Sequence, residues 1–246
     1  MNSRANWLAL ALCLVFFFTA AYRIETPGIQ ADEALFSMGN FYPQGVGYSM
    51  KAFGHTIPLM QMSYLGSFKA WVYAPIFKLF GVTPATIRLP MILLGAITLY
   101  LLYLFLSNTV SPAAGLMALA LLALEPTFLW TTRCDWGPVA IEHFLIVSAV
   151  FAVYRRKFPL AAFLIGLAFW NKLTALWIVF GLSTAALLLY GHLLRKFLTP
   201  RTVALSLLMF AAGSQGVRRT DPRGRRSPHG RRASIQRAGK PLRSRL

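Results

Sequence analysis

Charge is scarce in this 246-residue chain, and acidic charge most of all. Seven Asp and Glu stand against 25 Lys and Arg. Charged residues make up 13% of the chain, about half of the ~25% usual in soluble domains, and 57% of the residues are hydrophobic. This composition excludes an ordinary water-soluble domain. Cysteine is also rare, because only Cys13 and Cys134 occur and they lie in distant segments, so no disulfide framework is implied.

The alternating segments of ~10 residues that are typical of a transmembrane β-barrel are missing. Instead, several apolar runs approach the ~20 residues that a helix needs to cross a ~30 Å hydrocarbon core. We therefore predict an all-α polytopic membrane protein with about seven transmembrane helices. They are expected at residues 6–22, 89–107, 112–130, 137–154, 158–170, 173–190 and 201–213.

The distribution of basic residues predicts the orientation in the membrane. Asn171 and Lys172 divide an apolar stretch that would be ~50 Å long as one helix, so two shorter helices fit better. With two helices there and the N-terminus in the cytoplasm, most basic residues of the short loops fall on the cytoplasmic side. They are Arg4, Arg155, Arg156, Lys157, Arg195, Lys196 and Arg201. The long loop 23–88 is then extracytoplasmic, and an inner-membrane location is expected.

The last segment, residues 214–246, differs from everything before it. It carries ten Arg and one Lys against one Asp, so that it supplies +10 of the net charge of +18. A segment with so few apolar residues and no aromatic residue cannot bury a core, and we expect it to be disordered. Its abrupt composition favours a shifted reading frame over a lipid-binding tail. The excess charge therefore indicates no nucleic-acid partner, and residues 1–213 are the expected membrane domain.

Asp32 and Glu33 are the first candidates for chemistry, since they are adjacent in an acid-poor chain and open the outer loop. A carboxylate near an apolar interface becomes more basic, which suits removal of a proton from a hydroxyl. Asp135 lies in the turn after the third predicted helix, on the same side of the membrane. The alternative, purely structural interpretations are solvated carboxylates at positions 32 and 33, and an Arg133–Asp135 pair that caps the next helix.

Basic and polar residues complete the predicted site. Cations on the outer side could stabilise a departing phosphate, and Lys51, Arg88, Arg133 and Lys172 lie there. Glu142, His143 and His55 are predicted as supporting polar groups, with the alternative that Glu142 and His143 are a buried pair. A divalent cation held by Asp32 and Asp135 is a further hypothesis, although no metal-ligand spacing such as H-x-x-x-H occurs. The aromatic stretch 64–80 with its two lysines is expected to form helices that lie in the membrane interface.

Several segments together resemble the membrane glycosyltransferases of the protein O-mannosyltransferase type, glycosyltransferase family 39. They are Ala31-Asp32-Glu33-Ala34, Phe80-Gly81, Arg88-Leu89-Pro90, Arg133-x-Asp135 and the run from Gly166 to Lys172. The resemblance covers about residues 5–213. It implies a GT-C helical bundle with catalytic outer loops, a polyprenyl-phosphate sugar donor and an inverting transfer. It also implies that Asp32 is the catalytic base with Glu33 beside it, and that Asp135 shapes the acceptor or metal site.

Members of that family continue through further helices, so the resemblance implies an N-terminal fragment whose donor and acceptor pockets are incomplete. The rival hypotheses are a transporter or channel and a non-catalytic membrane scaffold. A transporter of repeated architecture should show internal repeats, and none is apparent.

Overall fold

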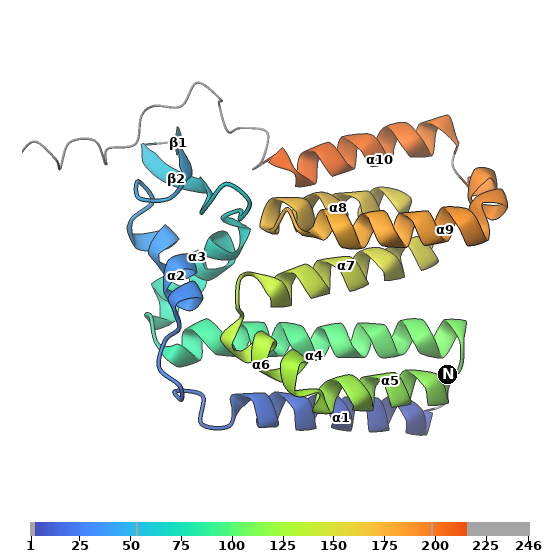
Figure 1. Ribbon diagram of the computed structural model, residues 1–246, viewed down its shortest axis with the longest axis horizontal. Helices are drawn as coiled ribbons and strands as arrows, with labels where there is room; N and C mark the ends of the chain where they lie inside the picture. Colours follow the sequence, from blue (N-terminus) through green and yellow to red (C-terminus); the bar gives the residue numbers. More distant parts are fainter. Residues whose placement is uncertain (1–2, 53, 198, 216–246) are drawn as a thin grey trace, which may run out of the picture.

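The computed structural model describes residues 3–52, 54–197 and 199–215. In these residues the chain forms ten α-helices and one two-stranded sheet. The longer helices run roughly along one axis as a bundle (Figure 1). The predicted tail, apart from Ser214 and Gln215, lies outside the described residues. The bundle helices are α1 (Ser3–Ala21), α4 (Pro84–Thr109), α5 (Pro112–Leu124), α7 (Val139–Tyr154), α8 (Phe158–Asn171), α9 (Ala175–Phe197) and α10 (Pro200–Gly213).

The second group of elements covers one end of this bundle. It consists of α2 (Ala31–Phe41), β1 (Tyr48–Ala52), β2 (His55–Met60) and α3 (Phe68–Phe80), and we call it the cap. The short helix α6 (Pro126–Cys134) lies at the same end. Figure 1 shows that the turn between α7 and α8 and the turn between α4 and α5 lie at the opposite end, which we call the far end.

The prediction of a helical polytopic membrane protein is confirmed. Three helices are long and apolar enough to span a membrane, namely α1, α4 and the Ala175–His192 part of α9. The pair α5–α6 makes a fourth if it counts as one bent span, whereas α7, α8 and α10 are shorter apolar helices. Three or four candidate spans thus meet the length criterion, against the seven that were predicted.

Two predicted helix boundaries are wrong for local reasons. The helix expected at 112–130 is broken at Glu125, where the axis bends by 63°. Pro126 stands at the first position of α6, and the Glu125 carboxylate accepts hydrogen bonds from the N–H groups of Thr127 and Phe128, so the chain starts a new helix there. The helix expected from residue 89 already begins at Pro84, because Thr83 and Thr86 form a reciprocal capping box.

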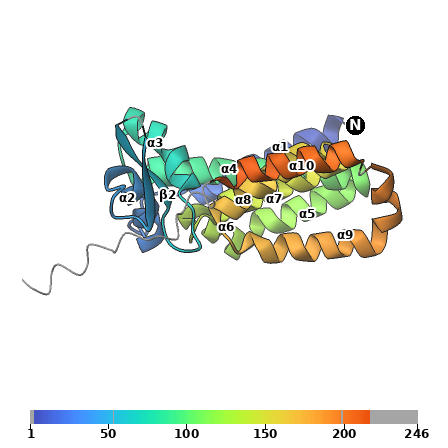
Figure 2. The same cartoon turned by 90° about the horizontal axis from the view of Figure 1, so that it is seen from above.

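Helix α4 is central to the packing. One side of α4 contributes Ile87 and Met91 to a core with α3 and α7, and the other contributes Ile92 and Leu99 to a core with α1 and α5. Figure 2 shows α9 along one edge of the bundle, and its apolar side chains such as Trp177 and Leu188 are exposed. An apolar exposed edge of this kind is what a lipid-facing helix requires.

The cap is folded rather than a simple loop, and its hairpin was not predicted. Strands β1 and β2 pair antiparallel, with Lys51 opposite Thr56. The cap is tied to the end of α8 by backbone bonds from Gly66 N–H to the Asn171 carbonyl (3.1 Å) and from Leu173 N–H to the Tyr64 carbonyl (3.0 Å). The aromatic stretch does form a helix, α3, whereas its position in a membrane interface stays a prediction.

Candidate functional site

The acids at the start of α2 are placed by the way that helix begins. Asp32 and Glu33 occupy its first turn, where negative charge is favoured by the helix dipole. The Glu33 carboxylate also accepts a hydrogen bond from the Gln30 N–H at 2.8 Å, which closes a capping box. This arrangement turns the two adjacent carboxylates in different directions.

Glu33 faces inward and forms an ion pair with Arg88. The Arg88 Nε donates to Oε1 at 2.7 Å and its Nη2 donates to Oε2 at 2.8 Å, a bidentate geometry. Both side chains are buried. Arg88 was predicted to bind phosphate and Glu33 to stand beside the base, and the structure instead pairs the two inside the protein.

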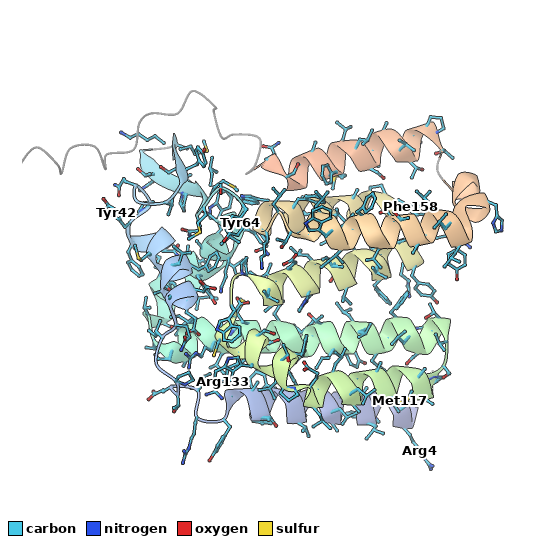
Figure 3. All side chains as sticks on the ribbon, in the orientation of Figure 1. Arg4, Tyr42, Tyr64, Met117, Arg133 and Phe158 are labelled. Carbon is cyan, nitrogen blue, oxygen red and sulfur yellow. The ribbon has the colours of Figure 1, made fainter. Side chains whose placement is uncertain are left out.

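Arg133 and Arg88 together hold the segment 22–28, which we call the strap and which leads from α1 to α2. Arg133 donates from Nη1 to the Tyr22 carbonyl at 2.8 Å, and from Nη2 to the carbonyls of Arg23 and Thr26. Arg88 donates to the carbonyls of Ile24 (2.5 Å) and Gly28 (3.1 Å). The side chain labelled Arg133 in Figure 3 belongs to α6 and lies at the cap end of the bundle. Two of the four predicted phosphate ligands, Arg88 and Arg133, therefore hold the strap through their guanidinium groups.

Asp135 forms a second buried ion pair, and its partner Lys69 was absent from the predicted site. The Lys69 Nζ lies 2.5 Å from Asp135 Oδ2, with the two side chains 0% and 2% exposed. The ammonium also lies over the rings of Phe36 and Tyr73. Asp135 Oδ1 accepts from the Ala140 N–H at 2.9 Å. Lys69 and Lys78 are both lysines in the apolar and aromatic sequence of α3, and this was the signal that could have pointed to a buried partner for Asp135.

Burial raises the pKa of Asp135 above its ordinary value, while Lys69 and the backbone N–H bonds act in the opposite direction. The ion pair thus offsets part of the cost of placing a carboxylate in the interior. Asp135 has the left-handed backbone conformation (φ 44°), at the point where the chain turns from α6 toward α7.

Asp32 has a different environment from the other two predicted acids. It is half-buried, and its Oδ2 accepts from the Gly137 N–H at 2.8 Å, which joins α2 to the start of α7. Gly137 has φ +70°, and a Cβ built on it would lie 3.5 Å from Lys172 Nζ. Asp32 and Lys172 therefore both adjoin the same glycine, so one predicted base and one predicted phosphate ligand do come together.

Glu142 and His143 lie further along α7. Glu142 is buried and its Oε1 accepts from the Thr174 hydroxyl at 3.4 Å. His143 stacks on Phe128, and its Nδ1 is buried without a hydrogen-bond partner among the described residues. Asn171 links the same region to α8, because its Nδ2 donates to the Pro138 carbonyl at 2.9 Å. Lys172 lies between Asn171 and Thr174 in the turn from α8 to α9, so these contacts place Glu142 near Lys172.

Comparison with known families decides the identity of this arrangement. A family model described as dolichyl-phosphate-mannose-protein mannosyltransferase matches residues 67–214, more than half of the chain. The chain belongs to this mannosyltransferase family. Comparison with curated proteins and with solved structures gave no match.

The predicted resemblance is thereby confirmed, and the chain is a membrane glycosyltransferase of the mannosyltransferase type by family. The family match begins just before α3 and ends after α10, so it includes both buried lysine and arginine partners of the acids. Asp32 and Glu33 precede the matched region. Their placement beside it comes from the contacts of Glu33 with Arg88 and of Asp32 with Gly137.

In this mannosyltransferase, two residues of the predicted site lie away from Asp32, Asp135 and Lys172 in the hydrogen-bond and ion-pair network of the described residues. Lys51 and His55 are exposed on the β-hairpin, near its turn. Among the described residues, neither forms a hydrogen bond or ion pair with Asp32, Asp135 or Lys172. The hairpin thus places them on the surface of the cap.

A divalent cation between Asp32 and Asp135 fits these residues poorly. The Oδ2 of Asp135 is occupied by the Lys69 ammonium and its Oδ1 by a backbone N–H, so a metal ion would have to displace both. In the part of the chain that the structure describes, no three His, Cys, Asp or Glu side chains gather as a metal site would require. The cation stays an untested prediction.

Proposed function

We propose that this protein transfers a sugar from a polyprenyl-phosphate donor to an acceptor hydroxyl at the extracytoplasmic end of the bundle, with Asp32 as the general base. One observation carries the assignment of the base. Of the three predicted catalytic acids, Glu33 is paired with Arg88 and Asp135 with Lys69, whereas Asp32 is half-buried and is held by a backbone N–H. A base must be able to reach its substrate, and Asp32 is partly exposed and forms no ion pair among the described residues.

The chemistry is a single displacement. The acceptor hydroxyl loses its proton to the Asp32 carboxylate while its oxygen bonds to the anomeric carbon of the sugar. The bond from that carbon to the phosphate oxygen breaks on the opposite face, which inverts the configuration and leaves polyprenyl phosphate. The Gly137 N–H fixes one carboxylate oxygen, so that the other can face the acceptor.

Lys172 is the proposed cation for the departing phosphate. Its ammonium lies beside Gly137 and so beside Asp32, and the side chain is half-buried. A cation in a partly desolvated position stabilises developing negative charge more strongly than one in bulk water. Arg88 and Arg133 are assigned a positioning role, because their guanidinium groups donate to the strap and, for Arg88, to Glu33.

The charge distribution supports the proposed orientation. Arg155, Arg156 and Lys157 lie in the far-end turn, and the acids Asp32, Glu33 and Asp135 lie at the cap end. The far end is therefore the proposed cytoplasmic side, in keeping with the positive-inside rule. Family membership favours this enzyme over a transporter or a scaffold.

The test is a transfer assay with purified protein, radiolabelled polyprenyl-phosphate mannose, and peptide or glycan acceptors bearing free hydroxyls. Asp32→Asn should lower kcat by about 10²–10⁴-fold, the usual contribution of a general base, with donor binding retained. Glu25→Gln is the matched control, because Glu25 is an exposed acid of the strap. Turnover of Asp32→Asn equal to that of Glu25→Gln would remove Asp32 from the base role. Donor binding without transfer to any acceptor would refute the activity of this chain as it stands.

A further inference from the structure

A groove between three helices lies at the far end of the bundle, away from the proposed active site. Its volume is about 320 Å³, within the range of roughly 300–1,000 Å³ for small-molecule sites. The apolar wall comes from α4, α7 and α8. The residues of this wall are Leu101, Phe151, Ala152, Leu160 and Leu164.

Positive charge borders the groove on the turn between α7 and α8. Arg155 and Lys157 both line it, and both are exposed. The turn itself is tight, since the N–H of Lys157 bonds to the carbonyl of Ala152 at 2.8 Å. Two cations are thereby held at one end of an apolar groove.

The start of α8 adds to the same electrostatic field. Lys157 is the N-cap of this 14-residue helix, and its side chain makes no capping hydrogen bond. The positive end of the helix dipole therefore points toward the turn that carries both cations. Within the groove, the Ser148 hydroxyl is buried and makes no hydrogen bond among the described residues. A buried polar group without a partner is costly, so an occupant with an acceptor oxygen would be favoured.

We propose that this groove binds an anionic glycerophospholipid of the surrounding leaflet. An acyl chain lies along the apolar wall, an ester oxygen approaches Ser148, and the phosphate lies at Arg155, Lys157 and the start of α8. Charge complementarity favours an anionic lipid, because a zwitterionic headgroup would bring its own positive group close to the two basic side chains. Basic sites between helices at the cytoplasmic surface recognise anionic headgroups by this chemistry. The site is independent of the proposed transferase reaction.

Native mass spectrometry of the full chain in detergent tests the proposal, with phosphatidylglycerol and phosphatidylcholine titrated separately. The wild type should retain phosphatidylglycerol in preference to phosphatidylcholine. Arg155→Gln combined with Lys157→Gln should lower the affinity for phosphatidylglycerol by about tenfold or more, since each basic side chain near the surface contributes roughly a fivefold gain in affinity for an anionic headgroup. Leu164→Trp should fill the groove and reduce the binding of both lipids.

The matched control is Arg201→Gln, which removes an exposed cation from the first turn of α10 at the same end. Its lipid retention should equal that of the wild type. Equal retention of the two lipids by the wild type would overturn the proposal, and so would unchanged phosphatidylglycerol retention in the charge variant and in Leu164→Trp. Displacement of the lipid by millimolar inorganic phosphate would show a phosphate site without lipid selectivity and would also overturn it.

Discussion

At the scale of residues, the three acids at the cap end of the bundle differ in their partners. Glu33 and Asp135 each share the interior with a cation, whereas Asp32 adjoins a backbone N–H and lies within reach of the surface. Removal of one partner from a buried pair leaves an uncompensated charge, which is far more costly than the loss of a surface pair. The ion pairs should therefore affect stability, and Asp32 should affect turnover.

Lys69→Met is expected to destabilise the protein by roughly 3–5 kcal/mol, because Asp135 stays buried without its cation. Lys69→Met combined with Asp135→Asn should recover much of this loss, since no unpaired charge remains. Lys78→Met, which removes an exposed lysine of the same helix, should have little effect. Thermal unfolding in detergent measures all three. An equal effect of Lys69→Met and Lys78→Met would contradict the buried pair.

The same variant should be sensitive to pH. Burial raises the pKa of Asp135, and loss of Lys69 removes the main opposing attraction. A carboxyl whose pKa is raised on folding contributes stability at low pH and loses it as the pH rises through the folded-state pKa. The deficit of Lys69→Met relative to the wild type should thus be smaller at about pH 5 than at about pH 8.

Much of this residue-scale picture was accessible from sequence, but partners were not. The scarcity of acids singled out Asp32, Glu33 and Asp135, and Lys172 was chosen as a cation on the outer side. Sequence cannot show which cation faces which acid, because the pairs join residues 55 or more positions apart, such as Glu33 and Arg88. Lys69 was therefore missed, and both arginines were interpreted as ligands for phosphate.

At the scale of elements, the strap shows how a segment without regular structure gains a defined shape. Its carbonyls accept from the guanidinium groups of two different helices, α4 and α6. Because Arg presents several donors in a planar fork, one side chain can hold several carbonyls at once. A lysine at either position cannot do so.

Arg133→Lys should loosen the strap and little else. Loss of charge-assisted bonds, each contributing about 1.5–3 kcal/mol, predicts amide hydrogen exchange about tenfold faster or more within residues 22–28. Exchange in α4 and α8 should not change. Arg23→Lys is the matched control, since that side chain is exposed on the strap itself. Slow exchange of the strap in Arg133→Lys would contradict its role as a clamp.

Helices α8 and α10 pack through glycines. A Cβ added to Gly166 would lie 2.5 Å from the Phe210 carbonyl oxygen and 3.1 Å from the Gly213 Cα, so Gly166→Ala must separate the two backbones. Overpacking of this kind costs about 1–3 kcal/mol. Gly181→Ala in α9 is the control, because no atom lies within 4 Å of its added Cβ. Thermal unfolding should show a lower Tm for the first variant alone, and equal values would exclude close packing of α8 on α10.

At the scale of the whole molecule, the bundle places all proposed chemistry at one end and the lipid groove at the other. Impermeant thiol reagents can test which end faces outward. Cys13 and Cys134 are both buried, so the wild type should not be labelled in intact cells. Lys51→Cys on the hairpin should be labelled from outside, whereas Lys157→Cys should react only after permeabilisation. The reverse pattern would invert the proposed orientation.

Periodicity and hydrophobic length predicted the fold class and most helices, because these depend on local composition. The cap hairpin was missed, since its strands are short and pair only with each other and with the chain around Gly66. The break between α5 and α6 was also missed. There the Glu125 side chain caps a new helix and Pro126 lacks the N–H that would continue the old one. The surrounding apolar stretch is otherwise long enough to span the membrane as one helix.

The strap has a consequence for sequence variation. Its five contacts with Arg88 and Arg133 all go to carbonyl oxygens, which every amino acid possesses. The arginines thus recognise the backbone of these five residues and not their side chains, although Ile24 also packs on the core of α1, α4 and α5 and Arg23 has the left-handed backbone conformation (φ 47°). Homologues aligned over this region should therefore vary at Tyr22, Thr26 and Gly28 and keep arginine at positions 88 and 133. The shape of the strap would then depend on residues far along the chain from the strap itself.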